Sequence, residues 1–362
     1  MVESIRQQID IKSLEAYLSK NIVQLKPPTS LKQFEFGQSN PTYQITTSDL
    51  SKYVLRKKPP GALLSVTAHQ IEREYRVLRA LEKTDVPVPR VYCLCNDNSV
   101  IGTPFYIMEF LDGRIIEDPD MPGLPPKEKK EMWYDAVRTL AKLHSINPID
   151  VDLQDFGKHS GFYDRQIKAL NKVSQVQANV KDVETLELVG AIPHIGEMLC
   201  YFSNKKMQPQ DRSSLTHGDY KIDNLVFHKT EPRVIVLICS SWEMATIGHP
   251  LSDLSNLTTP ICIETQPQAK LIELFTMDTR RELTKFYAEI AGWDPSSDLS
   301  WGSAFGFFRL TVILQGIASR HALRQASSAK ATDMAKCRHH AAQLAWEHVQ
   351  MNIKNEKKRT RL

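Results

Sequence analysis

The sequence predicts an α+β protein of two lobes, a small N-terminal lobe built on an antiparallel sheet and a larger, mainly helical C-terminal lobe. Two observations support this fold class. Short β-prone runs surround one amphipathic helix in residues 13–110, whereas apolar side chains after residue 126 recur mostly at helical spacing. The chain has 362 residues, of which 41% are hydrophobic, so it can bury a large core.

The expected N-terminal lobe comprises residues 1–110. Tyr43–Ile45 and Tyr53–Arg56 are β-prone runs on either side of a polar turn, which predicts two strands. Apolar residues recur at helical spacing in Ala68–Leu81, which predicts a helix. Thr103 and Pro104 then lead into Phe105–Met108, whose apolar side chains predict another strand.

The expected C-terminal lobe comprises residues 111–350 and begins with a proline-rich connection. Lys127–His144 carries apolar side chains on one face, which predicts a helix. Two apolar runs, Leu225–Phe227 and Val234–Ile238, predict short strands within an otherwise helical region. A basic tail, residues 351–362, closes the chain.

Composition excludes several classes of protein. Lys plus Arg number 46 and Asp plus Glu 42, so the net charge of +4 gives no argument for nucleic-acid binding. No window approaches the roughly 18 uninterrupted apolar residues of a membrane-spanning helix. The six cysteines lack Cys-x-x-Cys spacing and no secretory leader precedes them, so we expect free thiols, no structural zinc and a cytoplasmic location. No feature of the sequence specifies an oligomeric state.

The basic tail allows two interpretations. Five cations and one carboxylate lie between Lys354 and Leu362, and such a run is usually a solvated helix end. The alternative is an address, because Thr360-Arg361-Leu362 approaches the Ser-Lys-Leu type of peroxisomal terminus. A peroxisomal location therefore stays open beside the cytoplasmic one, and a mitochondrial location is a further alternative.

The segment His217–Asn224 presents two oxygen-bearing side chains from a loop before a predicted strand. In kinase-type phosphoryl transfer a carboxylate orients the attacking hydroxyl, and an Asn five residues later supplies an oxygen to magnesium. Asp219 and Asn224 have that spacing, so Asp219 is the candidate catalytic base and Asn224 a candidate metal ligand. The alternative is a simple turn followed by a strand cap.

Together with Trp242-Glu243 and Gly248–Leu254, this loop resembles the aminoglycoside phosphotransferase and choline kinase superfamily. The resemblance covers most of the chain and extends in particular to the phosphotransferase domains that animals fuse to acyl-CoA dehydrogenases and that fungi often carry alone. The segments that resemble this branch are Tyr53–Gly61, Arg73–Leu78 and Leu314–Arg320. The resemblance implies a protein-kinase-like fold, ATP and magnesium as cofactors, and a small-molecule hydroxyl as acceptor.

The resemblance also implies a nucleotide site in the N-terminal lobe. Gly37, Ser39 and Asn40 match a turn that covers the phosphates, although such a turn is also common in hairpins. Arg56 matches a phosphate-contacting cation and Glu74 its ion-pair partner, although Glu74 could equally be a surface charge. The other matched residues are Glu109 and Leu111 of a hinge that binds adenine through its backbone, and His217 and Asp253, which support the catalytic loop. Asp253 could instead be a helix N-terminal acid.

One position departs from the family pattern. Members place an Asp before Trp-Glu as the principal magnesium ligand, whereas this chain has Ser241 in a stretch that is about two residues longer. A neutral hydroxyl binds a hard dication weakly. Three explanations stay open: Glu243 or Asp223 supplies the charge, the chain is a pseudokinase that binds nucleotide or acts as a scaffold, or the coding sequence has a local insertion or splice difference.

The nearest branch implies a hydroxyacyl-CoA or a hydroxy acid as the acceptor. The residues of the late helices that could line its pocket are Phe305, Phe308, Arg309, Gln315 and Arg320, although aromatic side chains at helical spacing more often belong to a core. A protein kinase acting on Ser or Thr is disfavoured, because the Asp-Phe-Gly and Ala-Pro-Glu landmarks of that class are absent.

Overall fold

A computed structural model describes residues 9–34, 40–59, 70–237, 239–259, 277–325 and 331–359. The chain divides into two compact units. The first comprises the described residues of Met1–Phe156 and His217–Thr246, and the second those of Gly157–Thr216 and Ile247–Leu362. The lobes expected at 1–110 and 111–350 are defined by their binding roles and stay predictions.

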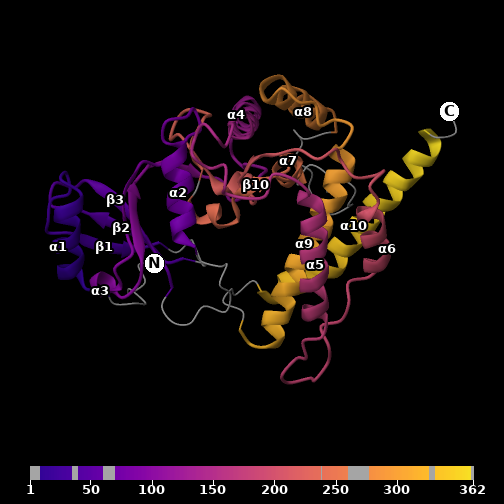
Figure 1. The fold of residues 1–362 in the computed structure, drawn as a ribbon, viewed down its shortest axis with the longest axis horizontal. Coiled ribbons are helices and arrows are strands. Elements are labelled where there is room, and N and C mark those ends of the chain that lie inside the picture. Colours follow the sequence, from indigo (N-terminus) through magenta and orange to yellow (C-terminus); the bar gives the residue numbers. More distant parts are fainter. Residues whose placement is uncertain are drawn as a thin grey trace. The chain divides into compact units, whose positions relative to one another are not determined.

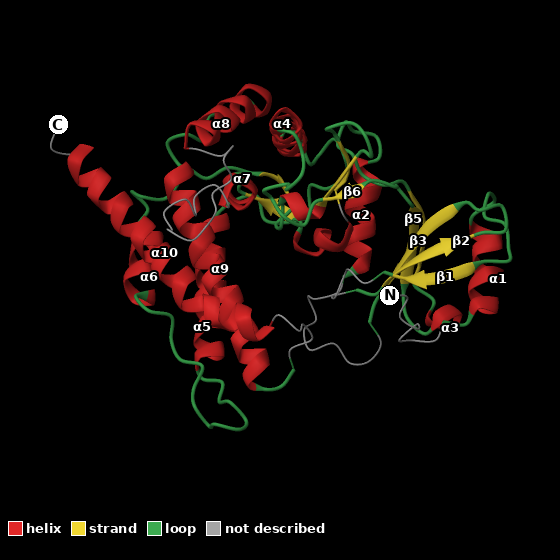
Figure 2. Cartoon of the chain, turned by 180° about the vertical axis from the view of Figure 1, so that it is seen from behind, coloured by secondary structure: helices red, strands yellow, loops and turns green. Residues whose placement is uncertain are grey.

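The first unit contains a five-stranded sheet in the order β1-β2-β3-β5-β4, with every pair antiparallel (Figure 2). The strands are β1 (Ser30–Gln33), β2 (Thr42–Thr46), β3 (Lys52–Lys57), β4 (Val91–Cys95) and β5 (Phe105–Glu109). The three strands predicted from the sequence are confirmed as β2, β3 and β5. The antiparallel sheet of the expected fold class is thus present.

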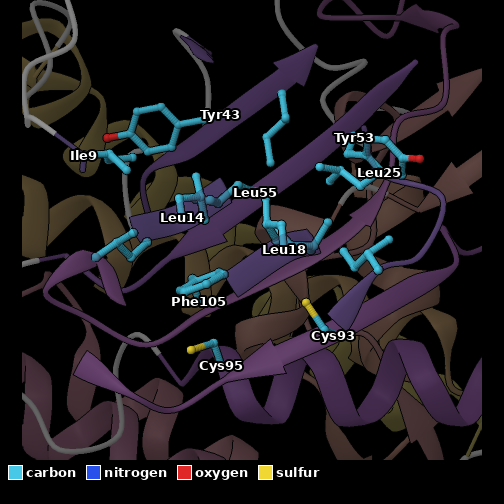
Figure 3. Close-up of a cluster of buried hydrophobic side chains, with 14 residues drawn as sticks. Ile9, Leu14, Leu18, Leu25, Tyr43, Tyr53, Leu55, Cys93, Cys95 and Phe105 are labelled. Atoms are coloured by element: carbon cyan, nitrogen blue, oxygen red, sulfur yellow. The ribbon is translucent and has the colours of Figure 1, made fainter. Parts of the chain in front are cut away.

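One face of this sheet is buried under helix α1 (Ile11–Asn21). Figure 3 shows Leu14 and Leu18 of α1 among Leu55, Phe105 and other side chains of the strands. Because strand side chains alternate between faces, the apolar odd-numbered residues of β2, β3 and β5 enter this cluster and the even-numbered ones face the other way. The short helix α3 (Asn98–Ile101) adds Ile101 to the same cluster.

The expectation of a single helix in this part of the chain is wrong, because α1 and α3 accompany α2 (Ile71–Leu81) in the described residues. Helix α1 is short, and only Leu14 and Leu18 of it are buried, so its apolar pattern is weak. The predicted helix Ala68–Leu81 is confirmed from Ile71 onward, and residues 60–69 lie outside the described part. Helix α2 buries Glu74 on the same face as Val77 and Leu78.

The rest of the first unit carries the loop with the candidate base. Helix α4 (Pro126–His144) confirms the helix predicted at Lys127–His144. A second sheet has the order β6-β8-β9, from β6 (Arg114–Ile115), β8 (Leu225–Phe227) and β9 (Val234–Leu237). Strands β8 and β9 confirm the two predicted runs as far as Leu237. The 3₁₀ helices η1 (Ile222–Asn224) and η2 (Cys239–Met244) precede β8 and follow β9.

The second unit is mainly helical and is organised around α9. Its helices are α5 (Phe162–Ala178), α6 (Ile195–Ser203), α7 (Leu251–Thr258), α8 (Met277–Ala291), α9 (Leu299–Ala322) and α10 (Ala331–Arg359). Strand β7 (Ser214–Thr216) pairs with β10 (Thr246–Gly248), whose first residue belongs to the first unit. Helix α9 packs against α5, α7 and α10 (Figure 1). Among the described residues, no helix is long and apolar enough to cross a bilayer.

The core interpretation of the late aromatic residues is confirmed. Phe305 and Phe308 of α9 are buried and pack against Phe202 at ring-centroid distances of 5.2 and 5.3 Å. Gln315 is also buried, where it accepts a hydrogen bond from Ser174 Oγ at 2.7 Å and donates one to the backbone of the α5–α6 connection. These three side chains hold the helices of the second unit together.

Candidate active site

Sheet register places the candidate phosphate cation in a polar row across three strands. Arg56 on β3 lies opposite Thr42 on β2 and opposite Tyr106 on β5. All three side chains leave the sheet on the face away from α1, because they occupy even-numbered positions. Glu74 of α2 reaches the same row, since Tyr106 Oη donates a hydrogen bond to Glu74 Oε2 at 3.0 Å.

Arg56 and Glu74 form the expected ion pair. The guanidinium donates from Nε to Glu74 Oε2 at 2.6 Å and from Nη2 to Glu74 Oε1 at 3.0 Å. The side chains are 1% and 0% exposed, respectively, so the charges of both depend on this bidentate contact. Burial alone would lower the pKa of Arg56, but the adjacent Glu74 carboxylate outweighs it and holds that pKa above its ordinary value.

The remaining donors of Arg56 also have acceptors within the protein. Nη1 donates to the backbone oxygen of Asn40 at 3.2 Å and to Thr42 Oγ1 at 3.0 Å. Nη2 donates to Glu243 Oε1 at 3.2 Å, and Asn40 Nδ2 donates to the same oxygen at 3.2 Å. A guanidinium has five N–H groups, and these contacts account for all of them. Arg56 is therefore the centre of a buried polar cluster.

The carboxylate of Glu243 reaches this cluster from η2, which is itself packed on the candidate catalytic loop, His217–Asn224. Trp242 is fully buried, with its ring centroid 4.6 Å from that of His217. Gly218 has φ +86°, and a Cβ at this position would lie 2.6 Å from the backbone oxygen of Met244. The loop can approach η2 this closely only because residue 218 is glycine.

The loop itself holds the candidate base in place. Asn224 Nδ2 donates to both the backbone oxygen and Oδ2 of Asp219, each at 2.8 Å. His217 Nδ1 accepts a hydrogen bond from the backbone N–H of Asp219 at 3.3 Å. The buried Tyr220 donates from its hydroxyl to the backbone oxygen of Ala136 in α4 at 2.7 Å, which anchors the loop. Asp219 and Asn224 are thus joined by hydrogen bonds, and their roles as base and metal ligand stay predictions.

Lys221 is a cation within the same loop. Its Nζ lies 2.9 Å from Asp223 Oδ2, and its side chain is 42% exposed. Burial alone would lower the pKa of Lys221, but the carboxylates of Asp219 and Asp223 outweigh that effect and raise it. The ammonium therefore stays charged beside Asp223.

A cavity of about 620 Å³ lies in the first unit beside these residues. Its polar wall includes Arg56 together with Asp223 and Asn224. The expected hinge residues Glu109 and Leu111 also line it. Its apolar wall includes Val54, Met108, Val226 and Val236. Apolar walls with a few polar groups at one end are typical of small-ligand sites.

The donor set suits a magnesium ion that is carried by phosphates. Among the described residues, no three His, Cys, Asp or Glu side chains gather to hold a metal by themselves. Magnesium usually takes only one or two protein carboxylates and completes its shell with phosphate oxygens and water. Asp223 and Asn224 offer one carboxylate and one amide oxygen on the cavity wall. Of the two substitutes considered for the missing Asp, Asp223 lines the cavity, whereas Glu243 bonds to Arg56 and Asn40.

Several predicted site residues are not placed with this group. Gly37 and Ser39 lie outside the described residues, as do Thr360, Arg361 and Leu362. Ser241 belongs to η2, but its side chain is outside the described part. Asp253 is buried at the start of α7 in the second unit. Its expected bond to the catalytic loop stays a prediction.

Sequence reasoning missed three members of the site. Tyr106 and Thr42 join Glu74 and Arg56 only through strand register, which the sequence does not reveal. Lys221 had a signal, because it stands two residues after the candidate base in the catalytic motif.

Sequence comparisons relate the chain to phosphotransferases. The family model described as phosphotransferase enzyme family matches residues 30–283. Acyl-CoA dehydrogenase family member 10 of Mus musculus is 36% identical over 326 residues, which are 88% of this chain and 29% of that protein. Acyl-CoA dehydrogenase family member 11 of Homo sapiens is 36% identical over 334 residues, which are 89% of this chain and 41% of that protein. The chain thus spans less than half the length of these relatives.

Solved structures give the same result. A candidate aminoglycoside phosphotransferase from Ralstonia eutropha is similar at a TM-score of 0.81 and 34% identity, covering 95% of this chain and 99% of that one. The streptomycin–ATP ternary complex of APH(2")-IIa is similar at a TM-score of 0.56 and 19% identity, covering 85% and 90%. The second likeness shows the fold alone. Together they confirm the predicted α+β, kinase-like fold class.

Proposed function

The chain belongs to the phosphotransferase enzyme family, and we propose that it transfers the terminal phosphoryl group of ATP to a hydroxyl of a small molecule. One observation carries the proposal: a single cavity is lined by Arg56 of the buried ion pair and by Asn224 of the His-Gly-Asp loop. Asn224 in turn holds the carboxylate of Asp219 at 2.8 Å. A nucleotide in this cavity would have its phosphates beside the candidate base.

Asp219 is the proposed catalytic residue. The hydrogen bond from Asn224 fixes one carboxylate oxygen, Oδ2, and leaves Oδ1 to accept the proton of the attacking hydroxyl. In the reaction, the acceptor oxygen bonds to the terminal phosphorus as the bond from that phosphorus to the bridging oxygen breaks. The electron pair of the broken bond stays with the departing diphosphate, and the acceptor proton passes to Asp219.

Asp223 and Asn224 are the proposed ligands of magnesium. When bound, the metal would neutralise charge on the phosphates. The two side chains supply oxygen atoms at the cavity wall, and both residues belong to η1, which directly precedes β8. The hinge backbone at Glu109 and Leu111, at another part of that wall, is the proposed contact for the adenine edge.

The acceptor that we propose is a hydroxyacyl-CoA or a hydroxy acid. This proposal is supported by the relatives, whose names are those of acyl-CoA dehydrogenases. Such an acceptor carries a hydroxyl that the Asp219 carboxylate could orient. A hydroxyacyl-CoA acceptor would also suit a peroxisomal or mitochondrial compartment as an alternative to the cytoplasm. The location of fluorescent fusions that carry or lack Thr360-Arg361-Leu362 at their C-terminal end would test the peroxisomal alternative.

Phosphate transfer from radiolabelled ATP to a panel of hydroxyacyl-CoAs, hydroxy acids, choline and aminoglycosides tests the function. Asp219→Asn should lower kcat by about 10²- to 10⁴-fold, the usual contribution of a general base, while ATP binding persists. The matched control is Asp85→Asn, which changes an exposed acid of the same unit. Equal activity of the two variants would remove Asp219 from the mechanism.

The pseudokinase alternative makes a different prediction for the same panel. It is favoured by Ser241, which stands where the family has a metal-binding Asp. A pseudokinase would bind ATP with a thermal shift that magnesium does not enhance, and would transfer phosphate to no acceptor. Ser241→Asp should then restore magnesium-dependent transfer, and sequencing of the transcript over Val234–Glu243 would show whether Ser241 is encoded.

A further inference from the structure

Helix α2 has a second attachment besides the ion pair of Glu74 and Arg56. Arg73 precedes Glu74 and leaves the helix in another direction, because consecutive helical residues are about 100° apart. Its Nη2 donates to the backbone oxygen of Ala245 at 3.1 Å and to that of Phe156 at 3.0 Å. Two adjacent residues of one helix therefore hold two different parts of the first unit.

The surroundings of Arg73 fix the guanidinium in place. Its central carbon lies 3.9 Å from the ring centroid of Phe156, a cation–π contact, and Phe156 is 2% exposed. Burial and the neighbouring charge of Arg76 lower the pKa of Arg73, so the position is costly for a cation. Because both hydrogen bonds go to backbone oxygens, the contact sets where the main chain of Ala245 lies relative to α2.

Ala245 directly follows η2 and is the last of three residues, 243–245, that contact both halves of the candidate site. The side chain of Glu243 accepts a hydrogen bond from the guanidinium of the buried ion pair at 3.2 Å. The backbone oxygen of Met244 lies 2.6 Å from where a Cβ on Gly218 of the candidate catalytic loop would be. Residues 243–245 therefore connect the ion pair, the candidate catalytic loop and α2.

We propose that Arg73 is a positioning residue, which holds α2 against residues 243–245 so that Glu74 stays on Arg56 beside the candidate catalytic loop. This inference rests on the proposed function. In that function the nucleotide phosphates lie along a wall that contains both Arg56 and Asn224, so a shift of α2 would separate the two ends of the wall. Arg73 is not among the described residues of that wall and would act through Glu74.

The alternative role for Arg73 is to tie α2 to the connection between α4 and α5 and nothing more. Arg76 is a matched control for that role, because it lies three residues later on the same face of the helix. Its Nη2 donates to the backbone oxygen of Asp152 at 2.8 Å, and the side chain pairs with Asp155 and is 43% exposed. Both arginines thus hold the α4–α5 connection, whereas the contact with Ala245 comes from Arg73.

Calorimetric titration of the full chain with a non-hydrolysable ATP analogue and magnesium tests the proposal without any acceptor. Arg73→Met keeps the length of the side chain but removes its donors and charge, and it should weaken binding by about 5- to 30-fold, within the range for residues that affect a site they do not touch. Arg73→Lys, which still has N–H donors for the same oxygens, should recover most of the lost affinity. Arg76→Met should change the affinity by less than about twofold.

A second background distinguishes positioning from a general loss of stability. If Arg73 acts through Glu74, Arg73→Met should weaken binding by less than about twofold in a Glu74→Gln chain, because that chain already lacks the charge through which α2 acts on Arg56. A merely structural role would give the same loss in both backgrounds. Should Glu74→Gln fail to fold, as judged by circular dichroism, Glu74→Asp takes its place.

The outcomes separate failure of this inference from failure of the proposed function. If the unsubstituted chain does not bind the analogue, the proposed function fails, and hydrogen exchange in peptides of α2 and η2 tests the attachment itself, which predicts faster exchange in Arg73→Met than in Arg76→Met. If the chain binds the analogue, the inference is overturned when Arg73→Met binds it equally well, when Arg76→Met weakens binding as much, or when the loss is the same in both backgrounds.

Discussion

Truncation of Glu74 alone should destabilise the first unit more than truncation of a matched surface partner. Glu74 is fully buried and accepts four hydrogen bonds at 2.6 to 3.1 Å, two from Arg56 and one each from Tyr106 and Asn40. Removing one partner of a buried ion pair costs about 3–5 kcal/mol, because the other charge stays buried without compensation. Glu74→Ala and Arg56→Met should each cost that much.

The double variant distinguishes this reasoning from a simple loss of contacts. Arg56→Met with Glu74→Met removes both charges and fills the space with apolar atoms, which is often close to neutral. The two single losses should therefore not add: the coupling energy should exceed about 2 kcal/mol, within the range for residues in direct contact. The matched control is the pair Lys58 and Glu72, which lies two residues from each partner.

Lys58 Nζ and Glu72 Oε1 are as close as the buried pair, at 2.6 Å, but the side chains are 23% and 38% exposed. Their removal should cost less than about 1 kcal/mol. Urea unfolding should be followed by hydrogen exchange in peptides of β3 and α2, so that the signal belongs to the unit that contains both pairs. Equal costs for the two pairs, or additive single variants at Arg56 and Glu74, would refute the argument.

Two further predictions concern the loop and the second unit. Gly218→Ala should lower the free energy of unfolding by about 2 kcal/mol or more and lower phosphate transfer, because the new Cβ would meet Met244. The control is Gly102→Ala, at φ +83° with nothing within 4 Å of the new Cβ, which should show only the conformational cost. Equal melting temperatures of the two variants would contradict this prediction. Burial, with a contribution from the nearby Arg280 charge, lowers the pKa of His348 below 6.5. The unfolded chain therefore binds more protons below about pH 6.5, stability should fall with pH there, and His348→Phe should flatten the melting temperature between pH 7 and about 5.5.

The local elements of this protein follow from short-range pattern. Tyr53–Arg56 and Phe105–Met108 predict strands that the structure extends by one or two residues, and Lys127–His144 predicts α4 almost to its ends. The two strands succeed because their β-prone runs are continuous and are buried on both faces, and the helix succeeds because its apolar side chains recur at helical spacing. Helix α1 has no such pattern in the sequence, because it buries only Leu14 and Leu18, and these pack on the sheet beneath it.

The catalytic loop was also accessible from sequence, because its chemistry lies within eight consecutive residues. The spacing of Asp219 and Asn224 predicts their roles, and the hydrogen bond of 2.8 Å between them needs no distant segment. The number of residues in the chain and its charge exclude other classes but name no acceptor. The family resemblance added Arg56 and Glu74 as a pair, which the structure contains.

Only the tertiary structure decided which side chains surround the ion pair of Arg56 and Glu74. Strand register brings Tyr106 and Thr42 beside Arg56, and η2 brings Glu243 from 187 residues away along the chain. Whether a buried cation is free to bind a ligand depends on how many of its donors already have acceptors, and those acceptors come from separate segments. The sequence by itself determined the fold class and the residues of the candidate catalytic loop, because both depend on short-range pattern. The packing of β3, α2 and η2 decided that every donor of Arg56 has an acceptor within the protein, whereas the side chain of Lys221 is 42% exposed.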